Sequence, residues 1–199
     1  MRRQIVAIAR PHEGTVADPA AIGLLRHEGT RLSLRDGRRV RVRAVGPADG
    51  APIQDFVRNL SVTSRRLRFF ATVNELPPGM LARLTAPAAP GRVVVAEAQE
   101  NGIARIVALA QHAPGTGDGT CELAFAVADA FQGVGLGRGL MAMQLRLARA
   151  ARYLQAIADV QYQNQAMIAL GLAHGFIIAA SPHDASLIRL ERDLQQPRQ

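Results

Sequence analysis

The sequence has no lysine and no tryptophan, one cysteine, and only six Phe and two Tyr. A single cysteine excludes an internal disulfide framework and fits a reducing compartment, so we expect a cytoplasmic protein. No apolar run approaches the roughly 20 residues that span a bilayer, and no membrane partner is expected. Residues 1–9 are too short and too weakly apolar for a secretory signal.

The basic residues are all arginine, and they give the chain a formal net charge of +8 at pH 7. The arginines are scattered, few aromatic side chains are available for stacking, and no DNA- or RNA-binding motif is present. We therefore expect no nucleic-acid partner. A basic surface suits a polyanionic cofactor or an acidic protein partner.

The length of 199 residues fits one domain with a sizeable core. Residues 1–30 are rich in turn signals and are predicted to be an N-terminal extension or linker. A dimer arm, and hence a homodimer, is compatible with this segment, as is disorder. Residues 31–195 are predicted to form the folded domain.

Hydrophobic periodicity in residues 31–195 predicts an α/β fold. Asn101-Gly102 between two apolar runs is a strong hairpin signal. Ser61 to Ser64 offer helix-capping hydroxyls, and Asn164 is a plausible N-cap. The expected strands are 39–44, 93–98, 103–110, 121–127, 154–160, 176–180 and 187–194, with a possible added edge strand at 4–9; the expected helices are 52–60, 79–84, 164–173 and a long one from Leu136 onward.

The stretch from Cys121 to Arg152 is typical of a strand, a glycine-rich loop and a helix. Glycines at 133, 135 and 137 let backbone N–H groups approach an anion, and the helix that follows adds free N–H donors. The loop is therefore a candidate phosphate site, although a tight strand-to-helix turn explains the glycines equally well. The spacing fits neither a P-loop nor a dinucleotide fingerprint.

The string Gln132-x-x-Gly135-x-Gly137 resembles the acetyl-CoA signature of the GNAT superfamily of N-acetyltransferases. A second motif also resembles the GNAT superfamily: Asn164 is followed further along the chain by Gly175-Phe176. The resemblance implies a mixed, mostly antiparallel sheet of about six or seven strands flanked by helices, and acetyl-CoA as cosubstrate. It implies these cofactor-binding residues: Phe125, Ala126, Val127, Gln132, Gly133, Val134, Gly135, Leu136, Gly137, Arg138 and Asn164.

Gly171 departs from the GNAT pattern, because many members carry at this position a tyrosine that protonates the leaving thiolate. Tyr162 is the nearest alternative. A CoA thiol has a pKa near that of cysteine, about 8.5, so thiolate can leave near neutrality without a dedicated acid.

Glu122 is the only acid in an apolar strand next to the expected cofactor site. Strand alternation places it on the face of Ala124 and Ala126, opposite Leu123 and Phe125. Burial there would raise its pKa toward the operating pH of a general base. A strand-end glutamate in solvent or in an ion pair is the other interpretation; the family resemblance favours the base.

A narrower resemblance lies upstream, where Leu60 to Phe70 reads LSVTSRRLRFF. The GNAT domains of Pat-type protein lysine acetyltransferases are similar here, carry a glutamate at the position of Glu122, and commonly lack the tyrosine. The resemblance implies acetylation of a lysine on an acyl-CoA synthetase, by direct attack in a ternary complex.

Two other functions remain open at this stage: an N-acetyltransferase for a small amine, and a non-catalytic acetyl-CoA-binding sensor. An acetyl-enzyme route through Cys121 is not expected, because no His/Asp partner is recognisable beside it. The five histidines show no metal-ligand spacing, so no metal is expected, and each is predicted in a loop or on the surface.

Overall fold

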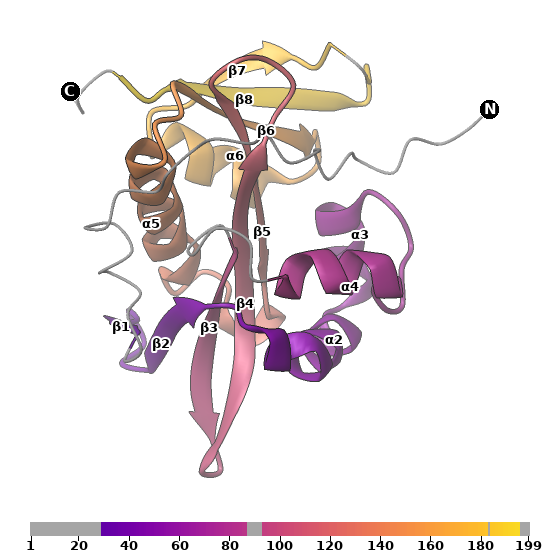
Figure 1. Cartoon of the computed structure of the whole chain (residues 1–199), viewed down its shortest axis with the longest axis vertical. Coiled ribbons are helices and arrows are strands. Elements are labelled where there is room, and N and C mark those ends of the chain that lie inside the picture. The colour runs from indigo at the N-terminus through magenta and orange to yellow at the C-terminus, as the bar shows by residue number, and fades with distance from the viewer. Residues whose placement is uncertain (1–28, 87–92, 183, 196–199) are drawn as a thin grey trace.

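A computed structural model describes residues 29–86, 93–182 and 184–195, and these form one eight-stranded sheet with helices on both faces (Figure 1). The predicted extension and the possible strand at 4–9 fall almost wholly outside the described residues. Within those residues, no helix is both long and apolar enough to cross a membrane.

The strand order in the sheet is β1-β2-β3-β4-β5-β6-β8-β7. Neighbouring strands are antiparallel except β5 and β6, which are parallel. Asn101 and Gly102 both have positive φ, 51° and 79°, which confirms the predicted tight turn between β3 and β4. The bounds are β1 Thr30–Ser33, β2 Arg39–Ala44, β3 Val93–Glu100, β4 Ile103–Pro114, β5 Thr120–Val127, β6 Gln155–Gln161, β7 Ile177–Ala180 and β8 Leu187–Asp193.

The sheet has eight strands, close to the expected count of about six or seven, and the additional strand is β1, which the sequence pattern does not predict. Its four residues are too few to establish an alternating pattern, and only the pairing with β2 makes them a strand. All seven strands predicted within residues 31–195 are present.

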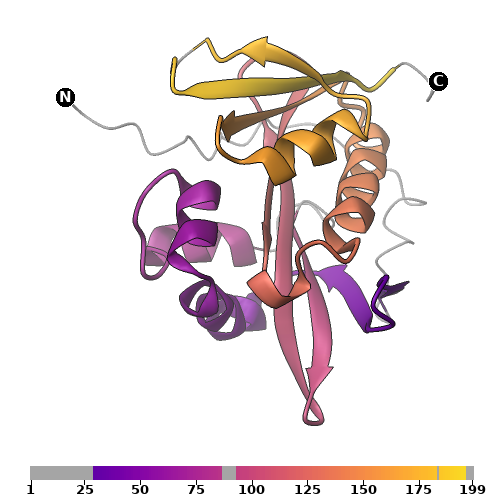
Figure 2. The same ribbon diagram turned by 180° about the vertical axis from the view of Figure 1, so that it is seen from behind.

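The helices lie in two layers, as Figures 1 and 2 show. Helices α2, α3 and α4 cover one face of the sheet, while α5 and α6 cover the other. Two short 3-10 turns, η1 and η2, connect elements. The bounds are η1 Pro47–Asp49, α2 Gly50–Asn59, α3 Val62–Phe69, α4 Pro78–Thr85, η2 Asp129–Phe131, α5 Leu136–Ala150 and α6 Gln165–Leu172.

Helix α5 buries side chains in two separate core clusters, and not along one narrow stripe only. Leu140 and Met143 pack with β2, β3 and β4, whereas Met141 and Leu145 pack with β5, β6 and β8. Each such side chain contributes about 1.5–3 kcal/mol when fully buried. The helix therefore joins the two halves of the sheet on this face.

Strands β5 and β6 pair only at their starts, from Thr120 to Glu122 on β5 and from Gln155 to Ile157 on β6. Beyond Glu122, β5 stays paired with β4, while β6 stays paired with β8. The two strands therefore separate in the middle of the sheet, and the space between them is filled by no other described strand.

Helix α6 crosses β8 at Gly171. A Cβ atom built on Gly171 would lie 2.6 Å from Cδ1 of Leu190, a side chain with 0% exposure. The close approach of helix to strand therefore requires a residue without a side chain.

We expect Gly171→Ala to lower the free energy of unfolding by about 1–2 kcal/mol, because overpacking the core outweighs the gain in helix propensity. Gly79→Ala in α4 is the matched control, since its Cβ would have only Arg83 Nη1 at 4.0 Å. Urea denaturation of both variants measures the difference. A Gly171→Ala protein as stable as the control would contradict the packing argument.

Candidate active site

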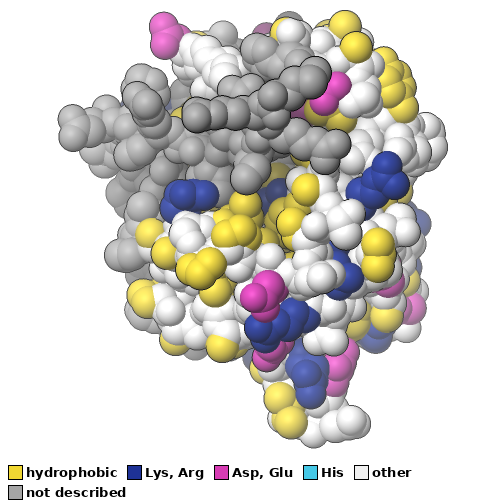
Figure 3. Space-filling view, turned by 90° about the vertical axis from the view of Figure 1, so that its right-hand side faces the viewer, with side chains coloured by type: hydrophobic (Ala, Val, Ile, Leu, Met, Phe, Trp, Pro, Cys, Tyr) yellow, Lys and Arg dark blue, Asp and Glu magenta, His cyan; other side chains and the backbone are white. Residues whose placement is uncertain are grey.

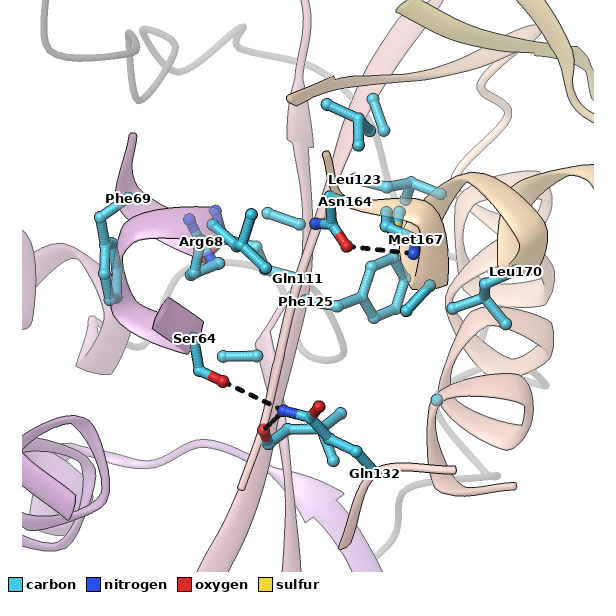
Figure 4. Close-up of a pocket in the computed structure, with 18 of the residues that line it drawn as sticks. Ser64, Arg68, Phe69, Gln111, Leu123, Phe125, Gln132, Asn164, Met167 and Leu170 are labelled. Carbon is cyan, nitrogen blue, oxygen red and sulfur yellow. Dashed lines mark hydrogen bonds between the residues drawn. The ribbon is translucent and has the colours of Figure 1, made fainter. Parts of the chain in front are cut away.

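The separation of β5 from β6 opens a cleft of about 530 Å³. It is lined by residues 122–127 of β5, residues 158–160 of β6, the glycine-rich loop, and side chains from α3, α4 and α6. Figure 4 shows α3 on one side of β5 and α6 on the other, with Arg68 and Met167 on opposite walls. Residues of α3 and α4 from one face of the sheet and residues of α6 from the other face therefore line the same cleft.

Glu122 lines this cleft and is half-buried. Ala126, on the same face of β5, packs with the α2 and α4 core, while Cys121 and Leu123 pack on the opposite face with α5. The alternation predicted from the sequence is confirmed, so Glu122 points toward the α3 side. Burial is the main cause that raises the pKa of Glu122, and the Asp159 carboxylate raises it further.

Two arginines oppose this shift. Arg68 of α3 and Arg189 of β8 both lower the pKa of Glu122. Arg189 is held by a two-point ion pair with Asp159, at 2.9 and 2.8 Å. Arg68 forms no ion pair within the described ranges; its Nε is buried without a hydrogen-bond acceptor, and burial lowers the pKa of its guanidinium to about 10. Glu122 therefore lies in a field of nearby charges that it does not contact by hydrogen bonds.

The glycine-rich loop presents backbone donors to the cleft. Gly133 and Gly135 have φ of 73° and 95°, a conformation that favours glycine. Helix α5 begins at Leu136 with no side-chain cap, so its first N–H groups have no partner inside the helix. An anion placed here would meet free N–H donors and the positive end of the helix dipole.

The structure places most of the predicted cofactor residues around the cleft. The side chain of Leu136 is instead fully buried, and that of Val134 packs against the same core, so only their backbones are available to a ligand. The predicted residues that line the cleft are Phe125, Ala126, Val127, Gln132, Gly133, Gly135, Gly137, Arg138 and Asn164.

The Gln132 side chain connects α3 to the end of β5 by two hydrogen bonds. Its Nε2 donates to Ser64 Oγ at 3.1 Å and to the Val127 carbonyl at 3.0 Å (Figure 4). Asp129 accepts from the hydroxyls of Ser61 and Ser64, at 2.7 and 2.8 Å. These bonds tie the start of α3 to the loop, and Ser61 also caps α3 as predicted.

Asn164 lines the cleft, and its side chain caps α6 by accepting from the Met167 N–H at 3.2 Å. The cap is as predicted. Tyr162 is 55% exposed and does not line the cleft. At Gly171, the position at which the resemblance to the GNAT superfamily led us to look for a tyrosine, a Cβ would lie 2.6 Å from Leu190 Cδ1, and Tyr153, the other tyrosine, does not line the cleft either. No tyrosine among the described residues therefore reaches the cleft.

Cys121 is fully buried, and burial raises the pKa of its thiol to about 12. This agrees with the expectation that it is not a nucleophile. The prediction of a loop or surface position is wrong for His112, which lies in β4, is 3% exposed and has its Nδ1 2.6 Å from Gln144 Oε1. His174 lies in the turn after α6, in agreement with the prediction, although it is buried. In the part of the chain that the structure describes, no cluster of His, Cys, Asp or Glu could hold a metal ion.

Several residues of the cleft were not predicted from the sequence. Apolar side chains of α3 and α4 form one wall, on the face seen in Figure 3, where apolar side chains gather beside arginines. The LRFF run at residues 67–70 is evident in the sequence, but nothing local indicates which of its side chains line the cleft. The unpredicted lining residues are Arg35, Leu67, Arg68, Phe69, Phe70, Met80, Leu84, Gln111 and Asp159.

Comparison with known proteins agrees with this geometry. Residues 61–176 match the Acetyltransferase (GNAT) family. The chain is 31% identical over 157 residues to Acetyltransferase PA5475 of Pseudomonas aeruginosa, a match that covers 78% of this chain and 84% of the relative.

Solved structures share the fold. The GNAT domain of S. lividans PAT is 27% identical, with a TM-score of 0.73 over 84% of this chain and 98% of that one. The structure of yncA, a putative acetyltransferase from Salmonella typhimurium with its cofactor acetyl-CoA, is 24% identical, with a TM-score of 0.61 over 80% of this chain and 96% of that one. Together with the separated strands and the exposed loop amides, the family match shows that the chain belongs to the Acetyltransferase (GNAT) family and is an acetyl-CoA-dependent acyltransferase.

Proposed function

We propose that this acetyltransferase transfers the acetyl group of acetyl-CoA to the side-chain amine of a protein lysine, with acyl-CoA synthetases as the expected class of target. One observation carries the proposal. The segment that resembles Pat-type enzymes, LSVTSRRLRFF, contains α3 and its two caps, and its residues from Thr63 to Phe70 contribute to the cleft that Glu122 lines. The resemblance thus falls on the wall that an acceptor would meet.

The chemistry of this wall supports a lysine acceptor. Leu67, Phe69, Phe70 and Met80 offer an apolar surface along which a four-carbon stem could lie while its amine reaches a polar group. The net charge of +8 suits a protein surface with acidic groups around the lysine. The fold shared with the GNAT domain of S. lividans PAT is consistent with the same class.

Glu122 is the proposed general base. A lysine amine has a pKa of about 10.4, so freeing its lone pair at pH 7 costs roughly 4–5 kcal/mol. A carboxylate whose pKa is raised by burial can accept this proton near neutral pH, directly or through a water. The neutral amine then attacks the thioester carbonyl in a ternary complex, without an acetyl-enzyme.

Backbone groups of β5 are the proposed oxyanion donors. Between Phe125 and Val127 the strand has no partner on the β6 side, so N–H groups that point into the cleft can hold the acetyl oxygen and the pantetheine arm. Asn164 is the proposed contact to that arm from the β6–α6 connection. The departing thiolate needs no protein acid, because its conjugate pKa is about 8.5.

Incubation of the purified protein with labelled acetyl-CoA, a panel of acyl-CoA synthetases and a panel of small amines tests the acceptor. We expect label on a synthetase lysine, identified by peptide mass spectrometry. Transfer to small amines alone would replace the proposal with the small-molecule function. Acetyl-CoA binding with no transfer to either panel would favour a sensor.

Glu122→Gln is expected to reduce kcat/KM by roughly 10²–10⁴-fold, the usual contribution of a general base, while acetyl-CoA binding stays close to that of the wild type. Glu100→Gln is the matched control, because Glu100 is exposed on the β3–β4 hairpin and does not line the cleft. Steady-state kinetics and a calorimetric Kd give both quantities. Unaltered turnover in the Glu122 variant would remove it as the base.

The pH profile tests the charges around Glu122. Because the carboxylate form is the base, kcat/KM should fall as pH drops through its raised pKa. Arg68→Met removes a cation that favours the carboxylate, so the acidic limb should move to higher pH, whereas Arg68→Lys should leave it near its original position. Identical limbs in the Met and Lys variants would show that Arg68 does not act on Glu122 through charge.

A further inference from the structure

The turn between β1 and β2 is docked on the glycine-rich loop, although the two are far apart in the chain. The Arg35 N–H donates to the Val134 carbonyl at 3.0 Å. Nearby, a Cβ built on Gly139 would lie 2.9 Å from Leu32 Cδ1, so β1 also approaches the first turn of α5 closely. This short strand therefore places its turn beside the cleft.

The turn is held rigidly by its own hydrogen bonds. The Leu34 N–H donates to the Arg38 carbonyl at 2.8 Å, and the Gly37 N–H donates to the Leu34 carbonyl at 3.1 Å. Asp36 accepts from the backbone N–H and the Nε of Arg38, at 3.1 and 2.7 Å. The position of Arg35 is thus fixed by its neighbours on both sides.

Arg38 anchors the turn to the segment that precedes the loop. Its guanidinium lies 3.9 Å from the centre of the Phe131 ring, and its Nη2 donates to the Ala130 carbonyl at 2.6 Å. Asp36 also forms an ion pair with Arg38, in which Asp36 Oδ2 lies 2.6 Å from Arg38 Nη2. Arg38 is therefore occupied by contacts within the protein.

Arg35 is not occupied in this way. Its side chain runs along Gly135, where a Cβ built on the glycine would be 3.7 Å from Arg35 Cγ and 3.8 Å from Nε. It lines the cleft together with Gly133, Gly137 and Arg138. Over residues 29–86, 93–182 and 184–195, no carboxylate pairs with its guanidinium. A cation without a carboxylate partner among the described residues therefore lies next to the glycine-rich loop.

We propose that Arg35 binds a phosphate group of acetyl-CoA and supplements the loop amides with a charged contact. A guanidinium presents paired N–H donors that match phosphate oxygens, which amides alone cannot neutralise. The signature Gln132-x-x-Gly135-x-Gly137 does not include this residue, because it reaches the site from a different part of the sheet. The β1–β2 turn is then a part of the cofactor site and not only an edge of the sheet.

Calorimetric binding of CoA and of dephospho-CoA, which lacks the 3′-phosphate, tests the proposal without any acceptor. Arg35→Ala should weaken CoA binding about tenfold, as expected for a charged hydrogen bond. Arg39→Ala is the control, because it removes the same charge from an exposed position of the same hairpin outside the cleft. Arg35→Lys should retain part of the affinity.

The two ligands distinguish the phosphate that is bound. A loss seen with both assigns Arg35 to the diphosphate, and a loss seen only with CoA assigns it to the 3′-phosphate; either result supports the proposal. A loss no larger than that of Arg39→Ala overturns it. The thermal unfolding midpoint of each variant confirms that it is folded, and the backbone bond to Val134 does not depend on the Arg35 side chain.

Discussion

The separation of β5 from β6 after Glu122 is the constraint on which the site depends. Both strands start as a parallel pair and then keep only their outer partners, β4 and β8. A sheet in which these strands stayed paired would have no room for a ligand and no free N–H groups on β5. The separation of the strands therefore creates the cleft. Glu122, the last residue of β5 that pairs with β6, lines this cleft, and burial raises the pKa of its carboxyl group.

The two walls of the cleft are connected by one polar network. Asp129 joins the hydroxyls of Ser61 and Ser64, and Gln132 joins Ser64 to the Val127 carbonyl. Helix α3, the proposed acceptor-side wall, is thereby fixed to the glycine-rich loop, the proposed site of the cofactor phosphates. The network holds the two walls at a fixed separation, and a fixed orientation of reactants is a large source of catalysis.

Gly171 belongs to a close contact between a helix and a strand. Gly171 lets α6 approach β8 so closely that Leu190 fills the space of a Cβ. A side chain at this position would require either the buried Leu190 side chain or α6 to move. At the opposite end of the same helix, Asn164 caps α6 and lines the cleft.

The sequence by itself determined the features that depend on neighbours a few residues away. These include the Asn101-Gly102 turn, the caps at Ser61 and Asn164, and the glycines of the loop between β5 and α5. Only the tertiary structure decided which charges surround Glu122, that Arg35 reaches the loop, that Gln132 braces α3, and that β1 is a strand. These are contacts between segments distant in the chain, and local periodicity carries no information about which side chains the fold brings together.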